Sequence, residues 1–304
     1  MSYQKLIDIA TELGCVVTQQ ASMAEATTFR IGGPADLLVD IPNDSAAAAI
    51  IAVCNHEDIP YMFIGNGSNL LVGDKGIRGA VLRLVEGEPM LQPELGDGVI
   101  YAPAGMQLKR LCQFARDNSL TGLEFAFGIP GTVGGAVYMN AGAYDGEMSQ
   151  VVTMAHCITP EGERGILPVA ELELGYRHSA LMEKGYIVTG VTLQLKAGDY
   201  DAIAAKMKDL MGRRRDKQPL EYPSAGSFFK RPTGYYAGAL VEQTGLKGFR
   251  VGDAQVSEKH AGFVVNRGHA SAAEMLELCR QVQEKVYEAH GVRLEPEVRF
   301  VGEF

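Results

Sequence analysis

The segment FGIPGTVGGAVYMNAGAY, residues 127–144, constrains the fold of this chain more than any other stretch. A glycine inside a helix or a strand costs about 0.5–1 kcal/mol relative to alanine, so its glycine density is unfavourable for either element. The density favours a loop whose backbone approaches a bound group closely and turns N–H groups toward it, as phosphate-binding loops do. The segment has no charge before Asp145, which is not typical of a solvated linker. We therefore expect a binding loop here.

The composition is that of an ordinary globular protein. Of the 304 residues, 46% are hydrophobic and 21% are charged, and the mean hydropathy is −0.01. No apolar run approaches the ~18 residues that a membrane span needs. The N-terminal stretch carries Lys5, Asp8 and Glu12 at helical spacing and does not resemble a signal peptide. We expect a cytoplasmic protein without membrane insertion, acting as a monomer.

The net charge and the cysteine pattern exclude two further classes. A charge of −9 and a pI near 5.3 disfavour nucleic-acid binding, which needs a basic patch. The five cysteines contain no C-x-x-C, and the histidines do not pair with them at zinc spacing. We expect no metal and five reduced, mostly buried thiols.

Hydrophobic periodicity and turn residues divide the chain into three predicted parts, residues 1–80, 81–199 and 200–304. The first part has the order of a βαβ unit, with a helix that Asp44 or Ser45 would cap. Its expected elements are a helix over 2–13, strands over 37–41 and 61–64, and a helix from 44 to 57.

The second and third parts have different patterns. The second is rich in strands, over 80–84, 99–103, 151–159 and 186–196, with a helix over 106–118. The third begins with a helix over 200–214 and closes on strands within 291–300. Between these lie a helix over 236–243, a strand over 262–266, and a helix that the capping box Ser271-x-x-Glu274 starts and that ends near His290.

The segment IGNGSNLL, residues 64–71, follows the second predicted strand. It lacks the third glycine of the dinucleotide motif, and no G-x-x-x-x-G-K-[ST] occurs in the chain. Two interpretations stay open: a plain turn, or a turn that aims N–H groups, Ser68 and Asn69 at an anion.

Four further signals have both a structural and a functional interpretation. Ser227 in AGSFFK is a turn residue that bonds its own backbone, or a hydroxyl that gives a proton to a developing carbanion. Glu297 in EPEVRF is half of an edge-strand ion pair with Arg299, or a site carboxylate. Arg177 in GYRHS is a surface charge or binds a carboxylate. The run 213–217 ends a helix favourably, or binds an anion.

Taken together, six motifs resemble those of the UDP-N-acetylenolpyruvoylglucosamine reductase (MurB) family of flavoenzymes. The resemblance spans nearly the whole chain in the family's order. It implies an α+β protein, with the two-lobed FAD-binding fold of the vanillyl-alcohol oxidase (PCMH) type and a C-terminal α/β substrate-binding domain. The motifs are TFRIGGPAD (28–36), IGNGSNLLV (64–72), GIPGTVGGAVYMNAGA (128–143), GYRHS (175–179), AGSFFK (225–230) and LEPEVRF (294–300).

The family resemblance implies a reaction in two halves. NADPH reduces FAD, and a hydride then passes from flavin N5 to C3 of UDP-N-acetylglucosamine enolpyruvate, giving UDP-N-acetylmuramate for peptidoglycan synthesis. By the same resemblance Ser227 protonates C2, while Arg177 and Glu297 stabilise the enolate form of the substrate carboxylate. The residues implied for the UDP-sugar are Lys217, Lys230, Arg231 and His260.

The cofactor is expected to be FAD, bound non-covalently because residues 127–144 contain no His or Cys. A branched side chain at Gly134 is expected to fill space needed near it. The spacing between GYRHS and the next strand leaves no room for the Tyr-bearing insertion of some members, so the chain resembles the branch that lacks this loop. The residues implied for FAD are Arg30, Gly65, Asn66, Gly67, Ser68, Asn69, Leu70, Gly128, Pro130, Gly131, Thr132, Gly134, Gly135, Ala136, Asn140, Ala141 and Gly142.

Two rival functions stay open at this level. One is a different FAD oxidoreductase of the same fold, against which the C-terminal AGSFFK and EPEVR motifs argue. The other is a non-catalytic nucleotide-binding module, which predicts either no flavin or a flavin that NADPH cannot reduce.

Overall fold

The computed structural model describes residues 3–86 and 94–304 and divides the chain into two compact units. Three of the boundaries fall within strands, one within a helix and one in a turn, so each unit is built from separate stretches of sequence. Unit 1 comprises Met1–Gln19, Leu37–Asn66 and Gly79–Gly212, and unit 2 comprises Gln20–Asp36, Gly67–Arg78 and Arg213–Phe304. The three-part division expected from sequence stays a prediction.

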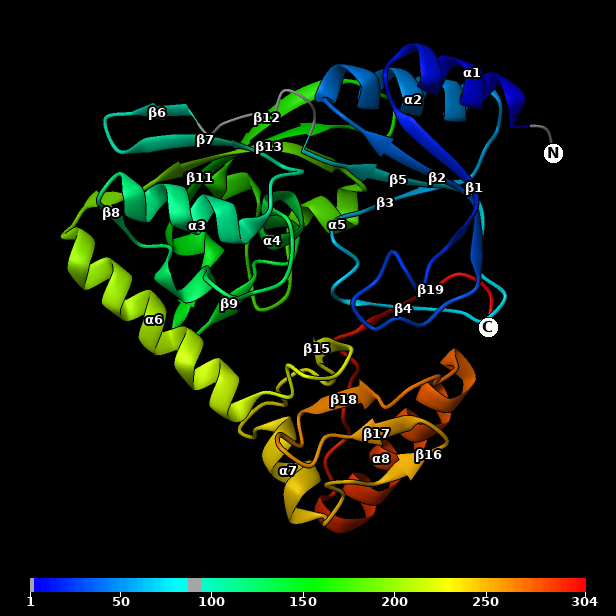
Figure 1. The fold of residues 1–304 in the computed structure, drawn as a ribbon, viewed down its shortest axis with the longest axis vertical. Helices are drawn as coiled ribbons and strands as arrows, with labels where there is room; N and C mark the ends of the chain where they lie inside the picture. The colour runs from blue at the N-terminus through cyan, green and yellow to red at the C-terminus, as the bar shows by residue number, and fades with distance from the viewer. Residues whose placement is uncertain (1–2, 87–93) are drawn as a thin grey trace. The chain divides into compact units, whose positions relative to one another are not determined.

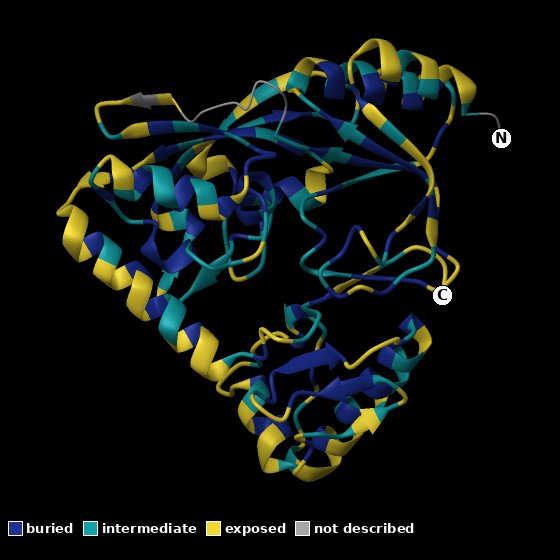
Figure 2. Ribbon diagram, viewed as in Figure 1, coloured by how far each residue is buried: buried dark blue, intermediate teal, exposed yellow. Residues whose placement is uncertain are grey.

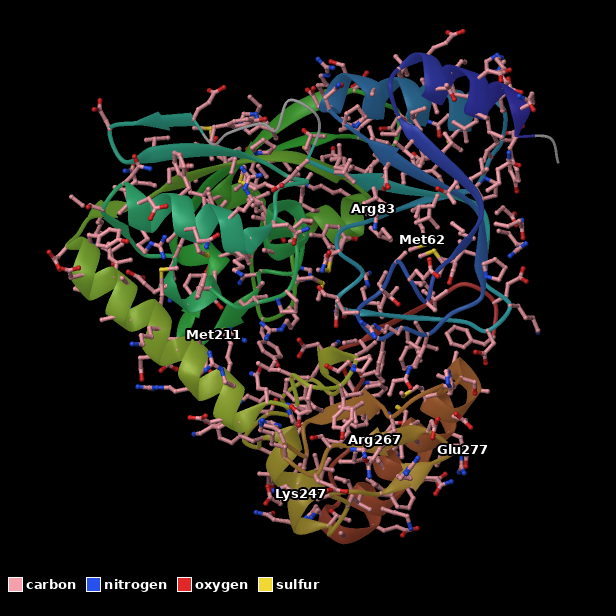
Figure 3. All side chains as sticks on the ribbon, viewed as in Figure 1. Met62, Arg83, Met211, Lys247, Arg267 and Glu277 are labelled. Carbon is pink, nitrogen blue, oxygen red and sulfur yellow. The ribbon has the colours of Figure 1, made fainter. Side chains whose placement is uncertain are left out.

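The N-terminal sheet has the strand order β1-β2-β5-β3, with β3 parallel to β5. Two helices, α1 and α2, lie together against it (Figure 1). Arg83 on β5, labelled in Figure 3, donates two hydrogen bonds to Asp40 on β2, from Nε to Oδ1 at 2.6 Å and from Nη2 to Oδ2 at 2.8 Å. The elements are α1 (Gln4–Glu12), β1 (Val16–Ser22), β2 (Pro34–Ile41), α2 (Asp44–His56), β3 (Tyr61–Ile64) and β5 (Ile77–Leu84).

Two details of this region differ from the sequence expectation. The N-cap of α2 is Asn43 rather than Asp44 or Ser45, because the Asn43 side chain accepts the N–H of Ala46 at 2.9 Å. Strand β1 was not predicted, since its exposed polar residues hide the alternation. The helix expected over 2–13 is confirmed as α1, although Ser2 lies outside the described residues.

An antiparallel sheet of order β12-β11-β13-β7-β6 forms the second half of unit 1. Helices α3 and α4 lie on the same side of it (Figure 1). The elements are β6 (Glu94–Gly96), β7 (Val99–Pro103), α3 (Leu108–Asp117), β8 (Leu120–Thr121), η1 (Glu124–Ala126), α4 (Val133–Tyr138), β9 (Gly142–Ala143), β10 (Gly146–Glu147), η2 (Met148–Gln150), β11 (Val152–Ile158), β12 (Arg164–Pro168), η3 (Val169–Glu171), α5 (Ala180–Lys184), β13 (Ile187–Gln194) and β14 (Lys196–Ala197).

A short helix, α4, runs through the glycine-rich segment, which the sequence favoured as a loop throughout. Thr132 caps it by accepting the N–H of Gly135 at 3.3 Å. A Cβ on Gly134 would lie 2.7 Å from Cβ of Ala104, so this glycine lets the helix approach the end of β7. The expectation of a loop was wrong because the glycine at 134 allows close packing against Ala104, a contact distant in sequence that local helix propensity does not include.

Helix α6 (Tyr200–Lys217) continues from unit 1 into unit 2, where α8 (Ala272–His290) packs against an antiparallel sheet of order β15-β18-β17-β16. The predicted capping box of α8 is confirmed at Ser271 and Glu274. The other elements are β4 (Leu70–Val72), β15 (Ser224–Ser227), α7 (Ala237–Gln243), β16 (Arg250–Val251), β17 (Ala254–Val256), β18 (Phe263–Asn266) and β19 (Arg299–Val301), which runs parallel to β4.

Each unit has its own hydrophobic core. Figure 2 shows buried residues along β17 and β18, which form the centre of unit 2 with α8. All five cysteines are free and buried, as the sequence predicted. Within residues 3–86 and 94–304, no helix combines the length and apolar character needed to cross a membrane.

Candidate functional site

Two of the predicted cofactor-binding turns touch one another in unit 1. Gly65 directly follows β3, and a Cβ placed on it would lie 2.7 Å from Oγ1 of Thr132 and 3.8 Å from Cα of Gly135. Glycine at position 65 is therefore required by the approach of the cap of α4. The structure brings together two segments that are separated by more than sixty residues in the sequence.

The first N–H groups of α4 are bonded within the protein. Val133 N donates to the carbonyl of Met106 at 2.8 Å, and Gly134 N donates to that of Ala104 at 2.9 Å. Gly135 N is bonded to Thr132, so the N–H groups of the first three residues of α4 all have hydrogen-bond partners within the protein. These three N–H groups are therefore not the donors expected to bind a phosphate.

Arg177 lies within the motif GYRHS, on a tight turn. Gly175 and His178 close the turn with two backbone hydrogen bonds of 3.1 and 3.2 Å. Arg177 has φ +54°, and its Nη2 donates to the carbonyl of Gly142 at 3.4 Å. The guanidinium also lies 5.0 Å from the ring centre of Tyr176. The turn thus places Arg177 at the exit of the glycine-rich segment.

A backbone hydrogen bond in unit 2 connects the segment that contains Ser227 with the segment that contains Glu297. Ser227 is the exposed last residue of β15 and pairs with Phe263 on β18. The next residue, Phe228, accepts the N–H of Glu297 at 2.8 Å through its carbonyl oxygen. Glu297 precedes β19, so the predicted strand containing both Glu297 and Arg299 is shorter than expected.

His260 lies beside the same strands, with a defined tautomer. Its Nδ1 accepts the N–H of Gly262 at 3.0 Å, so the neutral ring carries its proton on Nε2. The ring meets Phe263 edge-on, with centroids 5.1 Å apart. Burial lowers the pKa of His260, and the charges of Lys247 and Lys217 act in the same direction. The side chain therefore presents an N–H donor at neutral pH.

The other residues predicted for the UDP-sugar are exposed charges of unit 2. Lys217 is the last residue of α6, and Lys230 lies 3.5 Å from Glu295. The guanidinium of Arg231 stacks over Tyr236, 4.0 Å from its ring centre. Their exposure suits recognition of a charged ligand more than a role in packing.

The segment containing Thr28 and Arg30 is fixed to the C-terminal sheet of unit 2. Thr28 Oγ1 donates to the carbonyl of Ser224 at 2.8 Å. Asn266 Nδ2 lies 3.3 Å from the carbonyl oxygen of Phe29 and 3.4 Å from that of Arg30, which has φ +56°. Asn69 is fixed similarly, because its Nδ2 donates to the carbonyl of Glu297 at 3.1 Å.

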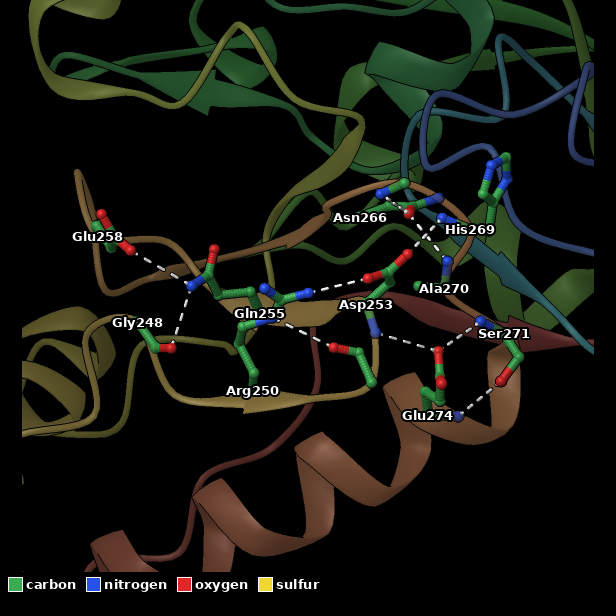
Figure 4. A network of polar contacts seen from close by, with 12 residues as sticks. Gly248, Arg250, Asp253, Gln255, Glu258, Asn266, His269, Ala270, Ser271 and Glu274 are labelled. Atoms are coloured by element: carbon green, nitrogen blue, oxygen red, sulfur yellow. Dashed lines mark hydrogen bonds and ion pairs between the residues drawn. The ribbon is translucent and has the colours of Figure 1, made fainter.

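Asn266 belongs to a wider polar network around β17 and the start of α8 (Figure 4). Its Oδ1 accepts the N–H groups of Gly268 and Ala270, each at 3.0 Å. The side chain is 2% exposed, and this degree of burial requires such partners. Sequence reasoning missed Asn266, although a polar residue ending the apolar strand FVVN was a usable signal.

The residues around Gly65 and Thr132 fit a flavin cofactor. Both turns place backbone where side chains would otherwise stand, and the segment between Phe127 and Tyr144 is uncharged. A planar, apolar ring system with a polar tail needs such a wall, together with a few placed polar groups. Residues 65–70 are mostly half-buried, which leaves them accessible to a ligand.

Comparison with known proteins shows the class and the family of the chain. A sequence profile described as "FAD binding domain" matches residues 35–165, and together with the fold it defines the chain as an FAD-containing oxidoreductase. A profile described as "UDP-N-acetylenolpyruvoylglucosamine reductase, C-terminal domain" matches residues 218–301. A reductase of that name from Agathobacter rectalis is 50% identical over 298 residues, covering 94% of each chain. The chain belongs to the UDP-N-acetylenolpyruvoylglucosamine reductase (MurB) family.

Two further relatives agree with this assignment. A reductase of the same name from Clostridium perfringens is 47% identical over 286 residues, covering 94% of this chain and 93% of its own. The crystal structure of MurB from Thermus caldophilus superposes with a TM-score of 0.80 at 38% identity, covering 94% of this chain and 98% of that one. The predicted family and the predicted α+β fold class are confirmed.

Proposed function

We propose that this chain reduces UDP-N-acetylglucosamine enolpyruvate to UDP-N-acetylmuramate, with NADPH as the reductant, in cytoplasmic synthesis of peptidoglycan precursors. The observation that carries the proposal is its likeness to reductases of this name over 94% of the chain. That likeness includes both the glycine-rich segment and the C-terminal sheet, so it covers the cofactor and the substrate parts of the chain.

FAD would be held without a covalent bond, by the residues of the two glycine turns named above and by Arg30. When bound, it would take a hydride from NADPH and deliver one from N5 to C3 of the enolpyruvyl group. The chain's own task is to bind and orient both partners and to manage the charge and the proton of the product.

Ser227 is proposed to give the proton to C2 of the substrate. Its hydroxyl is exposed at the end of β15, where the backbone on both sides is fixed by pairing with β18. A hydroxyl held in this way can donate a proton to a carbon on which negative charge develops. Water or bulk acid would then restore the serine.

Arg177 and Glu297 are proposed to stabilise the enolate form of the substrate carboxylate. The planar guanidinium of Arg177 can bind both carboxylate oxygens and offset the charge that grows on them. A protonated Glu297 can share its proton with the substrate carboxylate. The Nε2–H of His260 and the charges of Lys217, Lys230 and Arg231 are proposed to bind the UDP-sugar.

Stopped-flow absorbance of the flavin band, measured anaerobically, tests this proposal. NADPH should bleach the band, and UDP-N-acetylglucosamine enolpyruvate should then restore it rapidly. Bleaching without recovery would contradict the proposed substrate and favour another flavin oxidoreductase. A protein that binds no FAD, or binds FAD that NADPH cannot reduce, would instead be the non-catalytic module.

A further inference from the structure

Arg177 depends on a backbone conformation that an arginine rarely adopts by itself. Its φ of +54° lies in the left-handed region, which costs a non-glycine residue about 1 kcal/mol or more. Such a conformation persists only where the surroundings fix it. The direction of the Arg177 side chain is therefore set by what holds the turn between Gly175 and His178.

Two buried polar side chains hold this turn, one at each end. Asn140 Nδ2 donates to the carbonyl of Gly175 at 3.0 Å, and Ser179 Oγ donates to the carbonyl of Tyr138 at 2.7 Å. Both side chains belong to residues that are 0% exposed. Neither bond can be replaced by water without opening the structure. The turn is thus bonded twice to the chain at the end of α4, once to its last residue, Tyr138, and once to Asn140 just after it.

Both polar atoms of the Asn140 amide form a hydrogen bond within the protein. While Nδ2 donates to Gly175, Oδ1 accepts the N–H of Ser149 at 2.9 Å. Asn140 itself has φ +40°, a conformation that asparagine tolerates better than most residues. One side chain therefore joins three stretches: the end of α4, the 3-10 helix η2 and the Arg177 turn.

We propose that Asn140 and Ser179 are positioning residues for Arg177, fixing its turn to the end of the glycine-rich segment. The proposal rests on the role assigned to Arg177 above. Both residues act through the backbone of the turn and not by touching substrate. Their removal should matter in the half-reaction that develops charge on the substrate carboxylate, because a small misplacement of such a group is costly.

Half-reaction kinetics of four variants provide the test. Asn140→Ala and Ser179→Ala should each slow reoxidation of the reduced flavin by UDP-N-acetylglucosamine enolpyruvate, by about 10- to 100-fold. In Ser179→Ala, reduction of the flavin by NADPH should change less than about threefold, because Ser179 is not among the residues proposed to bind FAD. Asn140→Asp should resemble Asn140→Ala, because a carboxylate keeps the acceptor for Ser149 but cannot donate to Gly175. Ser179→Thr, which keeps the hydroxyl, should recover most of the rate.

A double-mutant cycle separates positioning from general loss of structure. If Asn140 acts through Arg177, adding Asn140→Ala to Arg177→Ala should slow reoxidation no further. The matched control is Asn55→Ala, which removes an exposed amide bonded to the carbonyl of Pro160 and should leave both half-reactions unchanged. If Asn140→Ala does not fold, the same cycle with Ser179→Ala decides.

The outcomes distinguish this inference from the proposed function. Additive effects of Asn140→Ala and Arg177→Ala, or equal losses in both half-reactions of Ser179→Ala, would overturn the positioning role while leaving the reductase assignment intact. Unchanged reoxidation in Arg177→Ala would overturn both the role of Arg177 and the inference that rests on it. Failure of wild-type reduced flavin to react with the enol ether would instead contradict the proposed function.

Discussion

A Cβ atom on Gly65 would lie 2.7 Å from Oγ1 of Thr132, the hydroxyl that caps α4 by accepting the N–H of Gly135. Gly65→Ala must therefore displace the cap or move the turn after β3. Losing an N-cap costs about 0.5–2 kcal/mol, so we expect the free energy of unfolding to fall by about this amount. The FAD content of the purified protein should fall too, measured as the ratio of flavin to protein absorbance.

Gly212→Ala is the matched control for Gly65→Ala. Gly212 lies in α6, and a Cβ on it would have no heavy atom within 4 Å. Replacing an open helical glycine by alanine should raise stability by about 0.5–1 kcal/mol and leave FAD content unchanged. Full FAD content in Gly65→Ala would contradict a site at this contact.

Ser227→Ala should separate the two half-reactions. The change removes the proposed proton donor from the exposed end of β15 but leaves the backbone pairing of β15 with β18 in place. We expect reduction by NADPH to remain near the wild-type rate and reoxidation by substrate to slow by about 100-fold or more. Stopped-flow traces of each half-reaction measure this directly, with exposed Ser45→Ala as the control. Equal slowing of both halves would be incompatible with a proton donor.

Gly134→Val should lower the FAD content through a clash inside the protein. The atoms nearest a Cβ at this position belong to Ala104 of the protein, at 2.7 Å, so a larger side chain meets the end of β7 before it meets any ligand. Poor FAD content in that variant would therefore accompany a loss of stability in the FAD-free protein as well.

Local chemistry made much of the fold predictable from sequence. The capping box of α8 depends on Ser271 and Glu274, three residues apart, and both of its bonds are present. The helix inside residues 127–144 was not predictable in this way, because what permits it is Ala104, in a different stretch of the chain. Likewise, β19 pairs with β4 across more than two hundred residues, a relationship without a local signal.

The candidate site shows the same division. Gly65, Thr132 and Arg177 were identifiable as residues, and the family resemblance supplied the roles proposed for Arg177, Ser227 and Glu297. The supports of Arg177 were not identifiable, because Asn140 acts on Gly175 from 35 residues away. A buried asparagine among small residues has no local mark that distinguishes a positioning group from a turn residue.

Asp74 should stabilise unit 2 by capping its longest helix. Its Oδ1 accepts the N–H of Ala272 at 2.7 Å and its Oδ2 accepts that of Ala273 at 3.0 Å, at the positive end of α8. We expect Asp74→Ala to lower the free energy of unfolding by about 1–2 kcal/mol in urea titrations. Glu277→Ala, on the exposed side of α8, should have a small effect, and equal losses in the two variants would contradict this role.

The native thiols should be unreactive. Burial raises the pKa of Cys54 and of Cys279 to about 12, and it also raises the pKa of Cys15 and of Cys157. Because the thiolate is the reacting form, iodoacetamide should label the folded protein slowly at mildly alkaline pH. In denaturant all five cysteines should be labelled, as mass spectrometry can count. Rapid labelling of Cys54 or Cys279 in the native protein would show that these residues are not buried as described.

Two half-buried histidines should make stability fall as the pH decreases. Burial lowers the pKa of both His156 and His260 below the value of about 6.5 in an unfolded chain. The unfolded protein then binds more protons than the folded one as the pH falls through that value, so the free energy of unfolding declines there and is unaffected well above it. Nε2 of His156 also forms a hydrogen bond of 3.0 Å with Thr192 Oγ1, and the ring meets that of Tyr101 edge-on.

Variants of these histidines should flatten that decline. We expect His156→Gln and His260→Gln each to reduce the loss of unfolding free energy between about pH 7.5 and 5, measured by urea titration at each pH. His269→Gln is the control, since it removes an exposed histidine and leaves both half-buried rings in place. Carboxylates also titrate in this range, so the difference between each variant and wild type carries the result. If the dependence of unfolding free energy on pH were unchanged in both His156→Gln and His260→Gln, these rings would take up protons as readily in the folded chain as in the unfolded one.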